Sequence, residues 1–335
     1  MSAISIGDLA SSFLMRSRAT QLKHQIDSLT QELATGQTSK VTQRLGDDYS
    51  YLTDIDQNLS RLEGFAVATT EAGLFLDAAQ ARVERMATIG KELATDLLST
   101  VPTHLDAVRE ANSARAAINL DQVITELNGS VAGRSIFGGT ATGAAPLASA
   151  DDLLSGLRGT IAGLGSAAAI QSAAQAWFDS PGGFRATVYS GSDDPLAPMA
   201  VTSDEQVSMT YMADDPKFRN LLRDLALTAL ATDPILNLSG DIQNEIMGNS
   251  AEGLMSGQDA LASVGADIGY SQSRIEQVSV RNNATRTALA MSRNTLLEAD
   301  PVDVVPQLEE AQFQLESLFL VASRTSQLSL SSFLR

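Results

Sequence analysis

Both ends of the sequence carry long heptad patterns, in which apolar and small residues recur at alternating steps of three and four. This spacing keeps a single stripe of side chains on one side of a supercoiled helix. The N-terminal stripes run from Met15 to Leu33 and from Leu52 to Leu76, and the C-terminal stripes run from Leu261 to Leu296 and from Leu308 to Ser329. Helices of this kind bury their stripes by pairing, so we expect the two distant ends of the chain to pack against each other.

The composition narrows the range of partners. The 335 residues include 40 acidic and 23 basic ones, which gives a net charge of −17, and no basic block is evident. Such a balance argues against nucleic acid and against an anionic membrane surface as partners. Because the chain has no cysteine, disulfides, thiolate nucleophiles and cysteine-ligated metals are excluded. We therefore expect the partner to be protein.

Two further features concern membranes and export. No stretch approaches the ~18 consecutive apolar residues that a membrane-spanning helix requires, so we expect no membrane insertion. The segment before Arg16 has no continuous apolar run, and Arg16 and Arg18 follow its apolar residues instead of preceding them. A cleaved secretory signal has the opposite order. If the protein is exported, we expect a route without a cleaved secretory signal.

Breakers and caps divide the terminal regions into helices. Gly36 and Pro102 each end a helix, and Asp47 or Asp48 can cap the start of one. Proline is tolerated at a helix beginning but not in its interior, so Pro301 starts a new helix. The expected N-terminal helices cover residues 1–34, 48–98 and 104–127, and two C-terminal helices meet at Asp300-Pro301.

The pattern changes after Asn128, where glycines and Pro146 indicate a long loop, and the region up to about Asn249 has the pattern of a compact inserted domain. The expected elements there are helices over 151–178 and 216–231 and strands over 185–190, 199–202 and 206–212. The predicted fold is therefore mainly α with a small α+β insertion. Long antiparallel coiled-coil helices from the two ends form a rod, and a mixed domain is inserted in the middle.

No set of residues in the sequence has the spacing of a catalytic, cofactor-binding or metal-binding site. His24 and His104 are the only histidines, and neither has a neighbour at ligand spacing, so we expect both on the surface. The segment Gly163–Ala168 resembles a dinucleotide-binding fingerprint but lacks the preceding strand, and we interpret it as part of a helix. Asp193-Asp194 and Asp214-Asp215 adjoin prolines, which is typical of turns and caps rather than of catalytic carboxylate pairs. We predict no enzyme activity, no cofactor and no metal site.

Two smaller features are open to more than one interpretation. Trp177-Phe178 and Phe184 flank a Pro-Gly-Gly turn, and we favour a small core in the middle domain over a binding hot spot. Asn282 lies within an apolar stripe. It either sets the register of paired helices or faces solvent, and the sequence leaves both possibilities open.

Four short segments follow one another in an order that is typical of one protein family. They are Glu32–Gly36 followed by Asp47-Asp48; the loop Gly133–Gly139; Val264-Gly265-Ala266 with Ile275-Glu276; and the ending from Leu308, with Ala311-Gln312, Leu315, Val321, Ser326 and Leu328-Ser329-Leu330. Together they resemble the flagellin family, although Asp267 stands where that family usually has arginine. The resemblance covers the two ends of the chain and leaves the middle domain unassigned.

Within the family, the Gly133–Gly139 loop and the ending Ser326–Leu334 are more similar to the branch that joins the flagellar hook to the filament. The resemblance implies an extracellular structural subunit that assembles as a ring at the distal end of the hook. The partners it implies are copies of the chain itself, neighbouring hook or hook-associated proteins, flagellin and an export chaperone. The alternatives are flagellin proper, which shares the terminal helices, and a cytoplasmic coiled-coil adaptor protein.

This interpretation divides the chain by role. The expected parts are an N-terminal assembly helix over residues 1–34, N-terminal rod helices over 35–132, an outward-facing inserted α+β domain over 133–250, a C-terminal rod helix over 251–309 and a C-terminal assembly helix over 310–335.

Apolar residues near both extremities have little chain left to cover them, and a monomer rarely exposes a stripe of that size. We hypothesise that these ends are disordered or loosely helical in the free subunit and fold against neighbouring subunits. The predicted assembly interface consists of Leu9, Phe13, Leu14, Leu22, Ile26, Leu29, Leu315, Leu318, Phe319, Ala322, Leu328, Leu330, Phe333 and Leu334.

Overall fold

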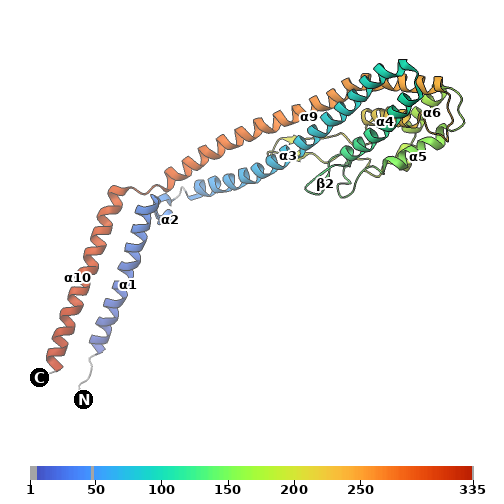
Figure 1. The fold of residues 1–335 in the computed structure, drawn as a ribbon. Coiled ribbons are helices and arrows are strands. Elements are labelled where there is room, and N and C mark those ends of the chain that lie inside the picture. The colour runs from blue at the N-terminus through green and yellow to red at the C-terminus, as the bar shows by residue number, and fades with distance from the viewer. Residues whose placement is uncertain (1–5, 47–48, 334–335) are drawn as a thin grey trace. The chain divides into compact units, whose positions relative to one another are not determined.

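Helices dominate the computed structural model (Figure 1). The structure describes residues 6–46 and 49–333. Within these ranges it describes all side chains except those of residues 6–9, 43–44 and 326–333. The helices are α1 (Ile6–Thr35), α2 (Val41–Leu45), α3 (Tyr49–Thr100), the short 3-10 helix η2 (Val101–Thr103), α4 (Asp106–Leu127), α5 (Ala150–Ile161), α6 (Ala167–Asp179), α7 (Phe184–Thr187), α8 (Pro216–Leu230), α9 (Gly240–Leu297) and α10 (Pro301–Phe333). The strands are β1 (Ser130–Val131), β2 (Arg134–Ser135), β3 (Met199–Ala200) and β4 (Gln206–Val207).

The strands form two small antiparallel sheets, β1 with β2 and β3 with β4. The prediction of a mainly α fold with a small β part is confirmed. The expected rod of coiled-coil helices remains a prediction. The chain divides into two compact units: unit 1 comprises residues 1–63 and 283–335, and unit 2 comprises residues 64–282.

The main helix ends lie where glycine and proline predict them. Gly36 follows α1 with a φ of 69°, and its N–H donates to the Glu32 carbonyl at 2.8 Å. Such a left-handed residue at a helix C-terminus favours glycine. Pro102 lies in η2, between α3 and α4, and Pro301 is the first residue of α10. Asp47 and Asp48, the predicted caps of α3, lie outside the described residues.

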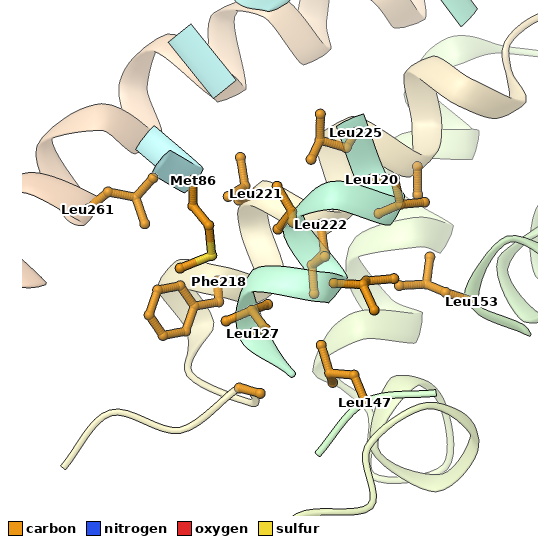
Figure 2. Close-up of a cluster of buried hydrophobic side chains, with 14 of the residues drawn as sticks. Met86, Leu120, Leu127, Leu147, Leu153, Phe218, Leu221, Leu222, Leu225 and Leu261 are labelled. Carbon is orange, nitrogen blue, oxygen red and sulfur yellow. The ribbon is translucent and has the colours of Figure 1, made fainter. Parts of the chain in front are cut away.

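Unit 2 contains the large hydrophobic core. Leucines of α4 and α8 fill its centre, and Met86 of α3 and Leu261 of α9 contribute from the long helices (Figure 2). Phe218 of α8 meets Phe137 edge-on, with ring centroids 5.4 Å apart. The core thus joins segments that are far apart in sequence, and it holds the middle of the chain on the long helices.

The alanine-rich stretch that the sequence predicts as one helix is two helices, α5 and α6. Ser149 and Asp152 form a capping box at the start of α5, and the Ser166 side chain accepts a hydrogen bond from the Ala169 N–H at the start of α6. Gly163 between them has a φ of 78°. The interpretation of this Gly-rich segment as helical is therefore wrong, because a glycine in the left-handed region ends one helix and a serine begins the next.

The strand predicted over residues 185–190 is only partly correct. Phe184–Thr187 forms the short helix α7, whereas Tyr189 forms an isolated antiparallel bridge with Leu147. The Ala148 N–H donates to the Val188 carbonyl at 2.8 Å beside this bridge, while packing of the Phe184 ring favours the helix before it. The Phe184 ring stacks on Phe178 at 5.2 Å, and Trp177 meets Phe178 edge-on at 5.0 Å. This confirms the small aromatic core predicted for these residues. The strands predicted near residues 199–202 and 206–212 exist, but only as the two-residue β3 and β4.

The β3–β4 hairpin lies against α9 at the end of unit 2. Glu205 in its turn pairs with Arg274 at 2.8 Å and with Arg281. Asn282 is buried, and its side-chain N–H donates to the Val201 carbonyl at 3.5 Å. Asn282 is therefore neither solvent-facing nor paired with another helix; it binds the hairpin backbone. Val201, Val207 and Met209 are buried in the same core as Ile275 and Val278 of α9.

Candidate functional site

The terminal helices α1 and α10 lie side by side in unit 1 and run antiparallel (Figure 1). Their facing residues follow the heptads read from the sequence. On α1 the buried or half-buried residues of this seam are Met15, Ala19, Leu22, Ile26 and Leu29, and on α10 they are Val304, Leu308, Ala311, Leu315, Leu318 and Ala322. Both sets alternate steps of three and four, which is the spacing of antiparallel helix pairs that interlock their side chains.

The core of this helix pair is small. Leu29, Ala299 and Val304 form one buried cluster, with Leu308 packed against it. Farther along the helices, Met15, Leu22 and Leu318 are only half-buried. Burial contributes about 25 cal/mol per Å² of apolar surface, so a pair of this kind gains little stability on its own.

Large apolar side chains are exposed on both helices. On α1 and α10 they are Phe13, Leu14, Leu33, Val302, Val305, Phe313, Phe319, Leu320 and Val321. Phe313 is 68% exposed and Val302 is 78% exposed. A concentration of large exposed apolar side chains is typical of a surface that binds another protein.

Four of the exposed α10 residues form a second stripe, which we call the outer stripe: Val302, Val305, Phe313 and Leu320. At ~100° per residue, Val302, Phe313 and Leu320 lie on the side of the helix opposite the seam residues Val304, Ala311 and Leu318, and Val305 lies about a quarter turn from the seam. Glu309 and Glu316 share this side. A helix with apolar residues on two opposite sides needs a partner on each, and α1 covers only one.

A groove runs between the two helices. It is lined by Leu14, Met15 and Leu22 of α1 and by Leu318 and Val321 of α10, and Phe313 of the outer stripe also contributes to its lining. Arg18, Gln21, Gln25 and Gln314 contribute polar groups to its edges. On another part of the pair, the Lys23 ammonium lies 5.9 Å from the Phe319 ring centre.

The structure divides the predicted interface residues into groups. The first group lies in the seam, where Leu29 is buried and the others are half-buried: Leu22, Ile26, Leu315, Leu318 and Ala322. Phe13, Leu14 and Phe319 are exposed and available to a partner. The side chains of Leu9, Leu328, Leu330 and Phe333, and the whole of Leu334, lie outside the description.

The interface predicted from the sequence does not include five apolar residues that the structure shows to be exposed: Val302, Val305, Phe313, Leu320 and Val321. A signal for most of them was present, because Phe313 and Leu320 are one heptad apart and Val302 and Val305 fall on the same side of the helix. The hypothesis expects ends that are disordered or loosely helical in the free subunit, whereas the structure shows their described parts as the helices α1 and α10. The structure pairs α1 with α10 because their stripes are complementary.

The titratable groups with shifted pKa values belong to unit 2. Burial raises the pKa of Asp224 to about 6, and Arg223 opposes the shift. Burial, together with the hydrogen bond to Asp267, raises the pKa of Tyr211 to about 12. The hydrogen bond from Arg85 lowers the pKa of Glu126. Each of these groups has an internal partner: Asp224 and Glu126 pair with arginines, and the Tyr211 hydroxyl donates a hydrogen bond to Asp267.

Among the described residues, no three histidine, aspartate or glutamate side chains are placed to hold a metal ion. None of the described helices has the length and apolar character needed to cross a membrane.

Solved structures share this fold, among them two flagellar proteins. The crystal structure of FlgL from Bacillus cereus matches 72% of this chain and 98% of its own, with a TM-score of 0.53 and 13% sequence identity. The structure of a putative flagellar hook-associated protein from Vibrio parahaemolyticus matches 75% of this chain and 99% of its own, with a TM-score of 0.53 and 14% identity. The chain has the fold of these two proteins. No protein-family model matches the sequence, and a search among curated proteins found no match.

Proposed function

We propose that this chain is a structural subunit of the bacterial flagellum that joins the hook to the filament, the role of the hook–filament junction protein, also called hook-associated protein 3. The observation that carries the proposal is the α1–α10 pair, in which α10 has apolar residues on two opposite sides and α1 covers one. The shared fold with two flagellar proteins and the family motifs at both ends support the same role.

On this proposal, the seam of the pair is satisfied within the subunit and the outer stripe meets neighbouring subunits. Assembly into a ring requires heterologous contacts, in which one surface of a subunit meets a different surface of the next. Two unlike terminal helices offer two such surfaces. The proposed partners are copies of the chain, adjacent hook or hook-associated proteins and flagellin, after export outside the cell with the help of a chaperone.

A deletion of the gene in its native bacterium tests the proposal. We expect intact hooks without filaments in electron micrographs, and flagellin monomers in the growth medium. Re-expression of the full chain restores the filaments. Cells that keep a normal number of filaments after the deletion would exclude the junction role.

Flagellin proper is the second candidate, because the paired terminal helices suit a filament subunit equally well. A seeding experiment separates the two. Purified flagellin elongates filament fragments indefinitely, whereas a junction subunit adds at most a terminal layer. Continued growth of fragments with the purified chain would favour flagellin.

A further inference from the structure

The connectors that follow α1 and precede α10 are joined through their backbones. The Ala299 N–H donates to the Gly36 carbonyl at 2.8 Å, and the Thr38 N–H donates to the Leu297 carbonyl at 2.8 Å. Gln37 and Glu298 thereby form an isolated antiparallel bridge. A reciprocal pair of backbone hydrogen bonds fixes which residue stands opposite which, so the bridge aligns the end of α1 with the start of α10.

A buried carboxylate holds the first connector on α1. Glu32 is 5% exposed, and its Oε1 accepts hydrogen bonds from the Ser39 N–H at 2.8 Å and from the Ser39 hydroxyl at 2.5 Å. The Ser39 proton is used in that bond, so Ser28, whose Oγ lies 2.7 Å from Ser39 Oγ, donates to Ser39. A carboxylate is costly to bury unless such hydrogen bonds satisfy it. The network therefore holds residues 36–39 in one position on α1.

The same end of the pair contains its buried cluster. Leu29 from α1, Ala299 from the second connector and Val304 from α10 pack together. Hydrogen bonds and apolar burial thus coincide at the connectors, whereas the seam beyond them is only half-buried at Leu22 and Leu318.

Among the described side chains, the seam specifies its register only weakly, through contacts such as that of the Lys23 ammonium with the Phe319 ring. Its residues are aliphatic or small, with Ala19, Ala311 and Ala322 among them. Among the described side chains of α1 and α10, no salt bridge joins the two helices. Because a heptad stripe repeats every seven residues, a slip of one heptad, about 10 Å along the axis, keeps apolar residues facing each other. The register therefore needs a further contact outside the apolar seam.

We infer that residues 36–39, residues 297–299 and Glu32 form a latch that sets the register of α1 against α10. The latch fixes where along the pair the outer stripe of α10 stands relative to Phe13 and Leu14 of α1. This consequence rests on the proposed function, since it matters only where neighbouring subunits contact both helices. The register itself is independent of that function.

The chain contains no cysteine, so two introduced cysteines can carry nitroxide labels without interference. Gln21→Cys on α1 and Gln314→Cys on α10 suit this purpose, because both side chains are exposed and line the same groove. Double electron–electron resonance on the full chain then measures the distance between the labels. We expect one narrow distance distribution in the labelled parent.

Thr38→Pro removes the N–H that donates to Leu297, while Thr38→Ala keeps it and serves as the matched control. Glu32→Leu, which removes the acceptor for Ser39 without introducing a helix breaker, is the second variant. In Thr38→Pro and Glu32→Leu we expect a distribution at least about twice as wide, or a second population displaced by about one heptad. Thr38→Ala keeps the parent distribution.

A narrow, parent-like distribution in both Thr38→Pro and Glu32→Leu would overturn the latch. Expression of the same variants, without labels, in the deletion strain provides a second readout. A changed distribution together with a loss of filaments supports the latch and the proposed function. A changed distribution with a normal number of filaments supports the latch and contradicts the use of the terminal pair in assembly.

Discussion

Asp224 of α8 is a buried carboxylate at the edge of the unit 2 core. Its oxygens accept hydrogen bonds from Arg223 Nε at 2.9 Å and Nη2 at 3.1 Å. It also lies against Gly253 of α9, where an added Cβ would be 2.3 Å from Oδ2. Burial raises the pKa of Asp224 from 3.8 to about 6, and the charge of Arg223 only partly offsets this.

The raised pKa makes a prediction about stability and pH. Between pH 3.8 and about 6 the folded state binds more protons at Asp224 than the unfolded state does, so the stability falls as the pH rises through this window. Compared with the neutral Asp224→Asn variant, the parent should lose on the order of 2 kcal/mol of unfolding free energy between pH 4 and pH 7. Urea unfolding at several pH values measures the difference.

Asp259→Asn, an exposed substitution on α9, is the control and should leave the pH profile of the parent unchanged. If Asp224→Asn and the parent lose stability in parallel over this window, then Asp224 titrates at its ordinary pKa and burial is not the cause of the dependence.

Single residues also show what the heptad pattern alone misses. Leu33 continues the α1 stripe in sequence, yet it is 45% exposed, while the neighbouring Glu32 is buried. The stripe stops at Leu29 because α10 begins only at Pro301, and the connector covers Glu32 through Ser39. The position of a connector depends on contacts across the chain, so no local pattern reveals it.

At the scale of elements, the β3–β4 hairpin stabilises the last turns of α9 in unit 2. Glu205 bonds to Arg274 and Arg281, which are two turns apart on α9. Beyond Asn282 the next residues of α9, 283–288, are all exposed. The hairpin therefore packs on the last part of α9 that is buried by other elements of unit 2.

We predict that Glu205→Gln weakens this contact and raises amide hydrogen exchange in residues 275–282. Because the two arginines are about half exposed, the loss is modest, about 0.5–1 kcal/mol, which corresponds to roughly two- to five-fold faster exchange. Hydrogen-exchange mass spectrometry on the full chain measures it. Added salt should bring the parent closer to the variant, because salt screens exposed ion pairs.

Asp204→Asn is the matched control in the same turn, since the Asp204 carboxylate accepts a hydrogen bond from the adjacent Ser203 hydroxyl. Equal exchange rates in residues 275–282 for the parent and Glu205→Gln would show that apolar packing alone holds the hairpin on α9.

The helix boundaries were predictable where a single residue decides them, as at Gly36, Pro301 and the start of α8 at Asp215-Pro216. They were not predictable where packing decides. The helix α7 begins at Phe184 because Gly183 lies so close to Trp177 that a Cβ would be 1.9 Å from its carbonyl oxygen. That approach seats the Phe184 ring on Phe178 and favours a helix over residues 184–187, and β pairing is left only to the bridge at Tyr189.

For the whole molecule, the terminal heptads predicted that the two ends of the chain pair, and the α1–α10 pair confirms it. They did not predict which residues remain exposed after pairing. A stripe shows that a helix has an apolar side, but only the position of α1 shows which side of α10 is covered. The outer stripe is therefore a result of the tertiary structure, even though its residues can be read in the sequence.

The outer stripe makes a prediction about assembly. Phe313→Gln combined with Leu320→Gln removes two large apolar side chains that are 68% and 56% exposed. Because neither is buried in the subunit, each substitution should change the unfolding free energy by no more than about 0.5 kcal/mol. Each side chain contributes about 2 kcal/mol if a neighbouring subunit buries it, so the loss of both should strongly reduce incorporation into flagella. Filaments per cell, counted in the complemented deletion strain, measure the effect.

The matched control is Val67→Gln combined with Ile235→Gln, which removes exposed apolar side chains from unit 2. Immunoblots of the medium and of the cells check that each variant is made and exported. If the outer-stripe variant is present at the parent level and restores the full number of filaments, the second apolar side of α10 has no role in assembly. If the unit 2 control instead abolishes filaments, the contacts that matter lie on unit 2. Loss of filaments in the outer-stripe variant alone identifies this side of α10 as a surface that a neighbouring subunit covers.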